Sequence, residues 1–333
     1  MTESGAEWVL GVDSGGSGLR ITLAAMRHGS APAAVGTVSS ADPVRTGLQG
    51  IDAAHLLAQL LPAARGLLTD AGAHERRLRA VCVGAAGMAT LGGALRAELP
   101  GALAREFGVR HLALAADAVT AYAGALGESP GAVVAGGTGV IAMGTDLRSW
   151  RRADGWGHLL GDCGSGAWIG RAGLAAAMRA YDGREGGSAA LRERAEAVFG
   201  APLSGLPGRL YPRTDRPAVL ASFAPEVARC AEEDPVAREV LREAASEIAA
   251  AAAAVCPATG PAGKKATVAL TGGLFRIGAP LLGPLEAELA ARLPHARTVE
   301  PGGDPLDGAL LIAARLAEGA LTLPSDPVLL FLG

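Results

Sequence analysis

The sequence contains few cysteines and no excess of basic residues, and each shortage excludes a class of protein. The four cysteines, Cys82, Cys163, Cys230 and Cys256, lie far apart, and no two of them form a C-x-x-C pair. Neither a disulfide framework nor a zinc knuckle is indicated, and a reducing cytoplasm suits such a chain. The net charge of -3 and the pI of about 6.1 differ from the basic balance of nucleic-acid binders. The expected partner is a small molecule, with no nucleic acid.

Long hydrophobic runs are also missing. The most apolar stretch, 248–256, is rich in alanine but about half as long as a membrane-spanning helix. The first residues, 1–8, include two glutamates and no basic leader, so no targeting segment is predicted. We therefore expect no membrane segment, and we expect 248–256 to form a helix packed inside a domain.

Glycine is abundant and occurs at informative places. The stretches 12–18 and 134–139 each follow an apolar strand and precede another, and Gly272-Gly273 ends the apolar run 266–270. Glycines at the end of a strand allow tight bends and present bare amides to an anion. Two such turns, with a third glycine pair, predict a nucleotide held between two related halves.

The hydrophobic pattern predicts an α/β fold with two domains, because 333 residues exceed the usual size of one core. In the first half we expect the order β-β-β-α-β-α-β. The ranges are strands at 8–13, 19–26, near Val35, at 79–84 and 111–115, and helices at 51–70 and 91–107. A short helix ending at Leu126 then leads to the hairpin 132–144, which restarts the same order.

The second half contains a helical stretch from 167 to 255, in which Pro202, Pro207, Pro212 and Pro217 mark a loop between helices. After it we expect a strand at 266–270, a helix at 280–293, a short strand near Thr298 and a helix at 305–318. The last residues, 326–333, are expected to be a tail.

Several of these motifs together resemble one family. The glycine hairpins, Asp117 after its strand and above all the block 155–170 are similar to the N-acetylglucosamine kinase and glucosamine kinase family. These are BadF-type sugar kinases of the actin-like ATPase superfamily. The resemblance runs from about Val9 to the last helix.

The resemblance implies two actin-like (ribonuclease H-like) ATPase domains flanking a nucleotide cleft. We expect them at 1–118 and 119–333, the second with a helical insertion at about 167–255 and a C-terminal helix that packs back on the first domain. The implied cofactors are ATP and Mg²⁺, the implied partner is an amino sugar, and a cytoplasmic homodimer is expected.

The resemblance assigns the nucleotide site to three glycine motifs. Asp13 is placed to hold Mg²⁺ through water, and the alternative is a hairpin Asp that bonds its own backbone. The second hairpin, with the Thr138 hydroxyl, suits the β- and γ-phosphates, and the third motif suits the adenosine. The assigned cofactor-binding residues are Asp13, Gly15, Gly16, Ser17, Gly137, Thr138, Gly139, Gly272 and Gly273.

The resemblance also assigns the sugar side. Asp117 is the expected catalytic base, which takes the proton of the attacking sugar hydroxyl, and the alternative is an N-cap of the following helix. Asp162, Gly155 and Trp156 are expected to bind the sugar. The alternatives are an Asp162 bonded to loop amides and a Trp156 packed in the protein.

Two positions depart from the family pattern. Asp42 stands where the family usually has an Asn that touches the sugar, and an ionised carboxylate suits a protonated 2-amino group better than an acetamido group. The alternative is that Asp42 only initiates the turn before Pro43. Cys163 replaces a Glu that usually follows the sugar-binding Asp, so the pocket loses a negative charge.

The expected function is therefore an ATP-dependent amino-sugar kinase that phosphorylates the 6-hydroxyl of N-acetylglucosamine or a related sugar. Glucosamine kinase is the first alternative. An ATPase activator of an acyl-CoA dehydratase or reductase needs cysteines to bridge a cluster, and these four lack the expected spacing. A sugar-sensing regulator is a third alternative, because a fold alone does not fix a function.

Overall fold

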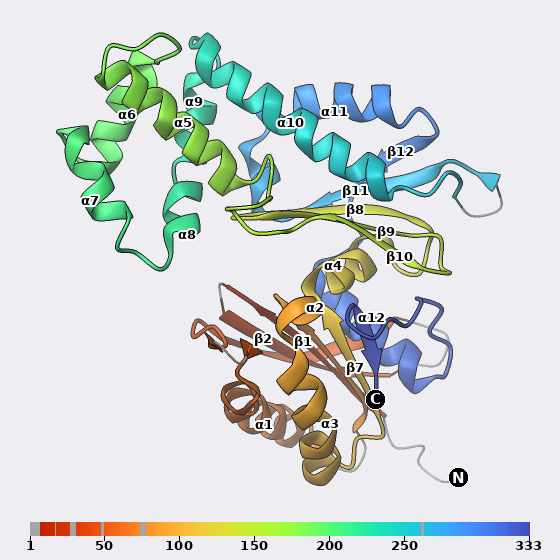
Figure 1. The fold of residues 1–333 in the computed structure, drawn as a ribbon. Coiled ribbons are helices and arrows are strands. Elements are labelled where there is room, and N and C mark those ends of the chain that lie inside the picture. The colour runs from red at the N-terminus through yellow and green to blue at the C-terminus, as the bar shows by residue number, and fades with distance from the viewer. Residues whose placement is uncertain (1–6, 17, 27–30, 48–49, 74–77, 261–262) are drawn as a thin grey trace, which may run out of the picture. The chain divides into compact units, whose positions relative to one another are not determined.

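The computed structural model describes residues 7–16, 18–26, 31–47, 50–73, 78–260 and 263–333. The chain forms two compact units, shown as ribbons in Figure 1. Unit 1 comprises Met1–Pro130, Thr145–Trp150 and Glu300–Gly333, and unit 2 comprises Gly131–Gly144 and Arg151–Val299. Compared with the domains expected from the sequence, unit 1 extends further along the chain and also includes the C-terminal segment.

Unit 1 contains a six-stranded sheet in the order β13-β7-β6-β1-β2-β3. The strands are β1 (Trp8–Gly15), β2 (Gly18–Ala25), β3 (Ala33–Ser40), β6 (Leu78–Ala85), β7 (His111–Ala116) and β13 (Leu330–Leu332). The strands β1, β6 and β7 run parallel, whereas β2 and β3 are antiparallel to their neighbours. A small separate ladder joins β4 (Thr46–Gly47) to β5 (Gly50–Ile51). The order of elements predicted along the first half, β-β-β-α-β-α-β, is confirmed, with two short strands and one short helix added to it.

Helices cover both faces of this sheet (Figure 1). They are α1 (Ala53–Asp70), α2 (Met88–Leu91), α3 (Gly93–Phe107), α4 (Asp117–Leu126) and α12 (Pro305–Ala317). A Cβ at Gly11 of β1 would meet Leu310 of α12, and a Cβ at Gly36 of β3 would meet Leu67 of α1. Because the register places Gly11 and Gly36 on opposite faces, α12 and α1 lie on opposite sides of the sheet.

The C-terminal stretch is not a tail. Its residues form β13, which pairs antiparallel with β7 in the register Leu330↔Ala115. Leu330 is fully buried. The sequence pattern does not indicate this strand, because a three-residue strand is too short to show a period of two and its partner is remote in the chain.

Unit 2 contains a five-stranded sheet in the order β10-β9-β8-β11-β12. The strands are β8 (Gly131–Gly136), β9 (Val140–Thr145), β10 (Trp150–Asp154), β11 (Ala266–Thr271) and β12 (Ala296–Val299). Position for position, this order repeats β3-β2-β1-β6-β7 of unit 1. The prediction that the second half repeats the first is therefore confirmed.

The helices of unit 2 comprise the predicted insertion and one further helix. They are α5 (Gly166–Tyr181), α6 (Ala189–Phe199), α7 (Leu206–Leu210), α8 (Arg216–Ala221), α9 (Ala224–Cys230), α10 (Pro235–Val255) and α11 (Ala279–Arg292), with 3₁₀ turns at Leu203–Gly205 and Gly273–Ile277. The proline-marked loop is thus largely short helices. Pro207 and Pro217 lie in the first turns of α7 and α8, where the missing N–H costs nothing.

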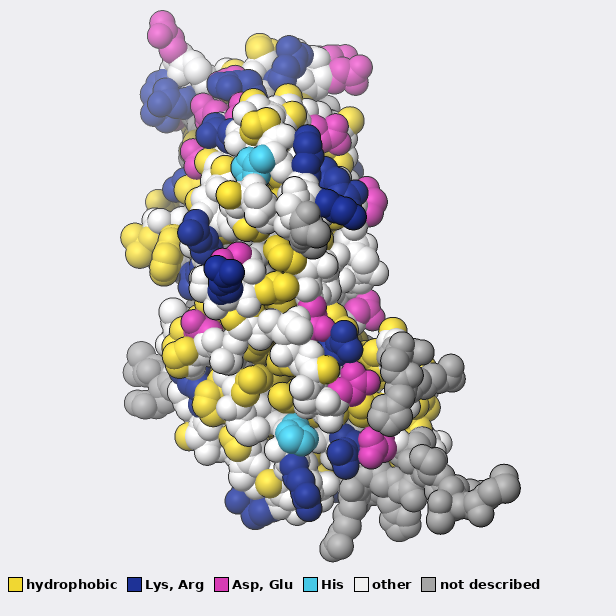
Figure 2. Space-filling view, turned by 90° about the vertical axis from the view of Figure 1, so that its right-hand side faces the viewer, with side chains coloured by type: hydrophobic (Ala, Val, Ile, Leu, Met, Phe, Trp, Pro, Cys, Tyr) yellow, Lys and Arg dark blue, Asp and Glu magenta, His cyan; other side chains and the backbone are white. Residues whose placement is uncertain are grey.

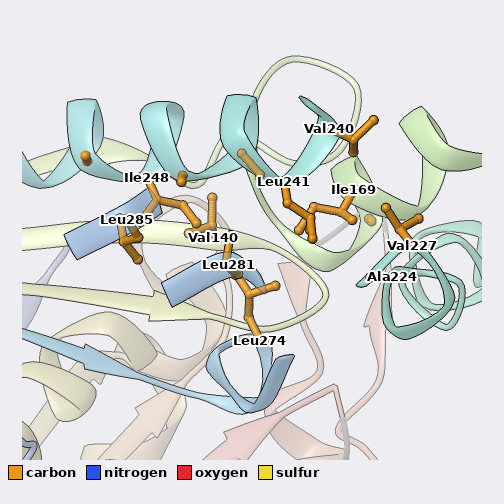
Figure 3. Packing of buried hydrophobic residues seen from close by; sticks show 14 of the residues in the cluster. Val140, Ile169, Ala224, Val227, Val240, Leu241, Ile248, Leu274, Leu281 and Leu285 are labelled. Carbon is orange, nitrogen blue, oxygen red and sulfur yellow. The ribbon is translucent and has the colours of Figure 1, made fainter. Parts of the chain in front are cut away.

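The core of unit 2 lies between α10, α11, the start of α5 and the sheet. Figure 3 shows Val140, Ile248 and Leu281 in one cluster of buried side chains. The alanine-rich end of α10 is buried in this cluster, as predicted for the stretch 248–256. Alanine suits the position because α10 passes close to β9, where a Cβ at Gly144 would meet the Val255 carbonyl.

The surface mixes charges of both signs. On the face shown in Figure 2, Lys and Arg side chains alternate with Asp and Glu side chains. Within the part of the chain that the structure describes, no helix combines the length and apolar character needed to cross a bilayer.

Candidate functional site

The first glycine turn joins β1 to β2 in unit 1. Gly15 pairs with Gly18 across the turn, and Ser17, one of the predicted phosphate ligands, lies outside the described residues. A Cβ added at Gly15 or Gly16 would meet no atom within 4 Å. The backbone at both glycines is therefore open to a ligand.

Asp13 stands opposite Arg20 beside this turn. Arg20 Nη2 donates to Asp13 Oδ2 at 2.7 Å, and Arg20 Nη1 donates to Asp304 Oδ2 at 2.6 Å. Within the described residues, Asp13 Oδ1 has no hydrogen-bond partner. Burial opposes ionisation of Asp304, but hydrogen bonds from Arg20 and from the Asp307 and Leu306 N–H groups hold its pKa below the usual value.

Sequence reasoning missed Arg20, although a signal was present. A tight turn that pairs Gly15 with Gly18 also pairs Asp13 with Arg20, because hairpin register follows from the turn. The two side chains therefore had to lie on one face of the sheet. Asp304 was noticed only as part of the entry to the last helix, where it is indeed the N-cap.

The open oxygen of Asp13 suits a magnesium ion. No group of three or more His, Cys, Asp or Glu side chains surrounds a potential metal position among the residues described. Mg²⁺ in nucleotide sites commonly keeps several waters and binds one or two carboxylates together with phosphate oxygens. One carboxylate oxygen beside an open glycine turn fits that mode of binding.

Asp117 lies at the same edge of the sheet as Asp13. The parallel strands place Asp13 in register with Gly84 of β6, and Asp117 directly follows β7. Asp117 is the first residue of α4, and Ala116 occupies the N-cap, so the N-cap interpretation is wrong. Asp117 Oδ1 accepts the N–H of Ala118 at 2.9 Å.

Asp42 lies in the exposed segment after β3 and is in contact with α1. His55 Nε2 lies 3.3 Å from Asp42 Oδ2, and the Arg45 N–H donates to His55 Nδ1 at 3.3 Å. His55 thus lies between the Asp42 carboxylate and the backbone N–H of Arg45.

The second glycine turn, between β8 and β9 in unit 2, presents free amides. The Gly137 N–H donates to the Gly139 carbonyl at 2.8 Å, and the first two N–H groups of α5 donate to the carbonyls of Gly137 and Thr138 at 2.9 and 3.1 Å. In the described part of the chain, the N–H groups of Thr138 and Gly139 meet no acceptor. Adjacent unpaired amides form an anion-binding concavity.

The third glycine motif adjoins this turn. Gly272 follows β11, has φ of 103° and approaches Gly136 so closely that a Cβ would lie 2.2 Å from the Gly136 carbonyl oxygen. Only glycine fits there. At Gly273 a Cβ would meet nothing within 4 Å. The structure therefore brings Gly137, Thr138, Gly139, Gly272 and Gly273 to one edge of the unit 2 sheet.

The predicted sugar loop, 155–163, is held by a residue that sequence reasoning missed. Asp154 Oδ1 accepts the N–H of Asp162 at 2.6 Å, and Asp154 Oδ2 accepts the N–H of Cys163 at 2.8 Å. Arg152 donates to the carbonyls of Asp154 and Gly155. Both aspartates have positive φ, 59° at Asp154 and 55° at Asp162. Such backbone strain in non-glycine residues is typical of functional sites.

Trp156 does not pack into the core. Its side chain is 60% exposed, and the Arg152 guanidinium lies 4.2 Å from the ring centroid. One ring face is therefore covered by a cation, in an arrangement worth about 0.5–1 kcal/mol at exposed sites. Leu159 and Leu160 in the same loop are also exposed.

Asp162 is half-buried and faces the second glycine turn. A Cβ built at Gly139 would lie 2.7 Å from Asp162 Oδ2, so the carboxylate rests against that turn. Burial and the negative charge of Asp154 raise the pKa of Asp162, against the opposing effect of the nearby Gly157 and Val140 N–H groups. A contact between Asp162 and the sugar stays a prediction.

Cys163, which follows Asp162, is a free thiol and is partly buried. Burial and the negative charges of Asp154 and Glu247 raise the pKa of Cys163, so the thiol form prevails at neutral pH. The other three cysteines are also free, and Cys82 and Cys256 are buried.

The chain matches a protein-family model over nearly its whole length. The model describes the BadF/BadG/BcrA/BcrD ATPase family and matches residues 10–313. The match includes all three glycine motifs, Asp117 and the 155–163 loop.

Similar proteins include sugar kinases. A candidate N-acetylglucosamine kinase from Chromobacterium violaceum is 30% identical, with 92% of this chain and 98% of that chain covered and a TM-score of 0.67. An N-acetylmuramic acid/N-acetylglucosamine kinase of Clostridium acetobutylicum is 41% identical over 69 residues, which are 20% of this chain and 22% of that protein.

A third similarity concerns the fold alone. A ROK family glucokinase from Streptomyces griseus, solved with glucose and AMPPNP, is 20% identical, with 92% of this chain and 99% of that chain covered and a TM-score of 0.52. The fold is thus that of two-domain actin-like ATPases.

Proposed function

Because the chain belongs to the BadF/BadG/BcrA/BcrD ATPase family, we propose that it is an ATP-dependent kinase of amino sugars. The observation that carries the proposal is the pair of unpaired amides at Thr138 and Gly139, next to the open glycines at 272–273. This edge of unit 2 would bind the phosphates and adenosine of ATP. In unit 1, the Gly15–Gly16 turn and Asp13 would bind phosphate oxygens and Mg²⁺.

The proposed reaction transfers the γ-phosphoryl group to the 6-hydroxyl of the sugar. The hydroxyl oxygen forms a bond to the γ-phosphorus while the bond from that phosphorus to the β,γ-bridging oxygen breaks, so that ADP leaves. Asp117 accepts the hydroxyl proton and orients the oxygen. Mg²⁺, when bound near Asp13, would neutralise negative charge on the phosphates.

N-acetylglucosamine is the first proposed substrate, in line with the 30% identical relative that carries this name. The carboxylate of Asp42, whose side chain is largely exposed, favours glucosamine as a second candidate, because a carboxylate can bind an ammonium group through a charge-assisted hydrogen bond. The proposed sugar-binding residues are Asp42, Asp117, Gly155, Trp156 and Asp162.

An ADP-release assay across several sugars tests the proposal. The panel contains N-acetylglucosamine, glucosamine, N-acetylmannosamine, N-acetylmuramic acid and glucose, with a control without sugar. One sugar should raise ADP release well above the control, and its product should be the 6-phosphate by NMR. Equal release with and without every sugar would contradict a kinase and favour the ATPase activator, and no release at all would favour a sensor.

The variant Asp117→Asn tests the catalytic base. Turnover should fall about 10²- to 10⁴-fold, the usual effect of losing a general base. The affinity for an ATP analogue, measured by calorimetry, should change little, because the variant keeps the size and the Oδ1 acceptor that binds Ala118. Turnover close to wild type would exclude Asp117 as the base.

A further inference from the structure

The 155–163 loop and the second glycine turn share a contact that neither motif explains alone. A Cβ at Gly139 would lie 2.7 Å from Asp162 Oδ2, so the carboxylate rests directly against the turn. The nearby Gly157 and Val140 N–H groups act to lower the pKa of this carboxyl group. Asp162 therefore joins the two segments, since its backbone belongs to the loop and its carboxylate contacts the turn.

Each side of this contact is anchored. On the side of the turn, the Val140 side chain is buried in the core of unit 2, where Figure 3 shows it with Ile248. On the side of the loop, Asp154 bonds the backbone N–H of Asp162 and fixes its left-handed conformation. The loop also closes on itself, because the Gly161 N–H donates to the Gly157 carbonyl at 2.8 Å.

We propose that Asp162, held by Asp154, fastens the 155–163 loop to the second glycine turn, so that nucleotide binding at the turn orders the loop for the sugar. Asp162 and Asp154 are then positioning residues. The coupling to sugar rests on the proposed function, whereas the coupling between loop and nucleotide does not.

Two glycines of the turn provide a matched pair of variants. Gly139→Ala would place a methyl group 2.7 Å from Asp162 Oδ2, closer than such atoms normally approach, so the carboxylate must move away from the turn. Gly137→Ala makes the same chemical change two residues away, where a Cβ would meet nothing within 4 Å. Only the first variant should loosen the loop. Neither variant alters any charge.

Cys163 reports the state of the loop without any sugar. Its N–H is bonded to Asp154, and its thiol is partly buried, so loosening the loop exposes it. In a Cys230→Ser background, which removes the other partly buried thiol, Gly139→Ala should raise the iodoacetamide alkylation rate of Cys163 about tenfold. Gly137→Ala should leave the rate within twofold. Equal rates in the two variants, or no increase in Gly139→Ala, would overturn the proposal.

A second variant, Asp162→Gly, removes the fastening carboxylate and keeps the freedom to adopt the left-handed conformation. In the wild type, saturating Mg²⁺–AMPPNP should slow the alkylation of Cys163 at least fivefold. In Asp162→Gly this protection should disappear, although calorimetry shows nucleotide still bound. The alkylation rates of Cys163 are compared at the high-pH plateau of each pH profile, where the thiol is fully ionised. This is needed because removing the negative charge of Asp162 also lowers the pKa of the thiol. Protection that persists in Asp162→Gly, or that is absent from the wild type, would overturn the proposal.

Binding measurements with sugar and AMPPNP separate this proposal from the kinase proposal. In the wild type, the best sugar of the panel should tighten AMPPNP binding about fivefold, and AMPPNP should tighten sugar binding by the same factor. In Asp162→Gly both factors should fall to about one. A different result is that no sugar is a substrate, while nucleotide slows the alkylation of Cys163 in the wild type but not in Asp162→Gly. The kinase proposal would then fail, and the proposal that Asp162 fastens the loop to the turn would hold.

Discussion

Arg20 lies between two carboxylates from distant parts of the chain, next to the first glycine turn. Asp13 lies near the end of β1 and Asp304 caps α12, and both accept hydrogen bonds from the guanidinium. The hydrogen bond and positive charge of Arg20 favour the ionised form of Asp304. Because both contacts to Asp13 use Oδ2, Oδ1 stays available beside the glycine turn.

The variant Asp304→Asn tests this ion pair. Asparagine is as good an N-cap as aspartate, so the bonds from Leu306 and Asp307 can persist while the charge is lost. The folded-state pKa of Asp304 is below its usual 3.8, so the stabilisation is fully present above pH 4 and disappears as the pH falls through the folded-state pKa. The difference in unfolding free energy between wild type and variant, from urea titrations, should be constant from pH 7 to pH 5 and shrink at lower pH.

The control for this prediction is the Arg20→Gln background. There the Asp304→Asn substitution should have almost no effect, and the double-mutant cycle should give a coupling energy of about 0.5–1 kcal/mol for so exposed a pair. A pH dependence that survives in Arg20→Gln would show that another donor controls Asp304.

Residues of the candidate site differ in how far the sequence reveals them. Asp13, Asp117 and the glycines follow directly after apolar strands, and hairpin register adds Arg20. Asp154 could not be recognised in this way, because its role depends on the chain returning eight and nine residues later to place two N–H groups on its carboxylate. Loop closure of that kind leaves no periodic signal.

At the scale of elements, the close approach of α4 and α12 determines the packing behind the sheet of unit 1. At Gly308 of α12, a Cβ would lie 1.9 Å from the Thr120 carbonyl oxygen of α4. Neither backbone can yield without moving its helix. Only a residue without a side chain permits this helix contact.

Substituting Gly308→Ala should therefore destabilise unit 1. Overpacking at a backbone contact costs about 1–3 kcal/mol or more, which exceeds the gain in helix propensity. The control is Gly66→Ala in α1, an exposed helical glycine where a Cβ meets nothing within 4 Å. That variant should gain about 0.5–1 kcal/mol. Urea unfolding measures both, and equal shifts would contradict the packing argument.

The elements that the sequence predicts well are those with local signals. The helices α1 and α12 begin and end within about two residues of the predicted bounds, and α10 contains most of the predicted helical stretch 248–256. The strand β13 and the short helices α7 and α8 were missed, because a few residues carry no period and their place depends on distant partners. The sequence thus predicts the strands and long helices well, and it does not predict the short elements β13, α7 and α8.

At the scale of the whole molecule, the same strand order in both units places a glycine turn at the corresponding hairpin of each sheet. In each unit that turn is open to a ligand, at Gly15 and Gly16 in unit 1 and at Gly137 in unit 2. A ligand that binds a unit stabilises it, because the unfolding of that unit destroys the binding site.

Calorimetric unfolding tests this arrangement. Because each unit has its own core, the free protein should unfold in two transitions, and Gly308→Ala should identify that of unit 1 by lowering it. Mg²⁺–AMPPNP at about 100 times its Kd adds roughly 2.7 kcal/mol to any unit whose unfolding abolishes binding. Each unit whose glycine turn binds the nucleotide should therefore show a raised transition, and the proposed function expects this of both, since it assigns phosphate ligands to both turns. A transition that does not rise would remove the turn of that unit from the proposed ligands.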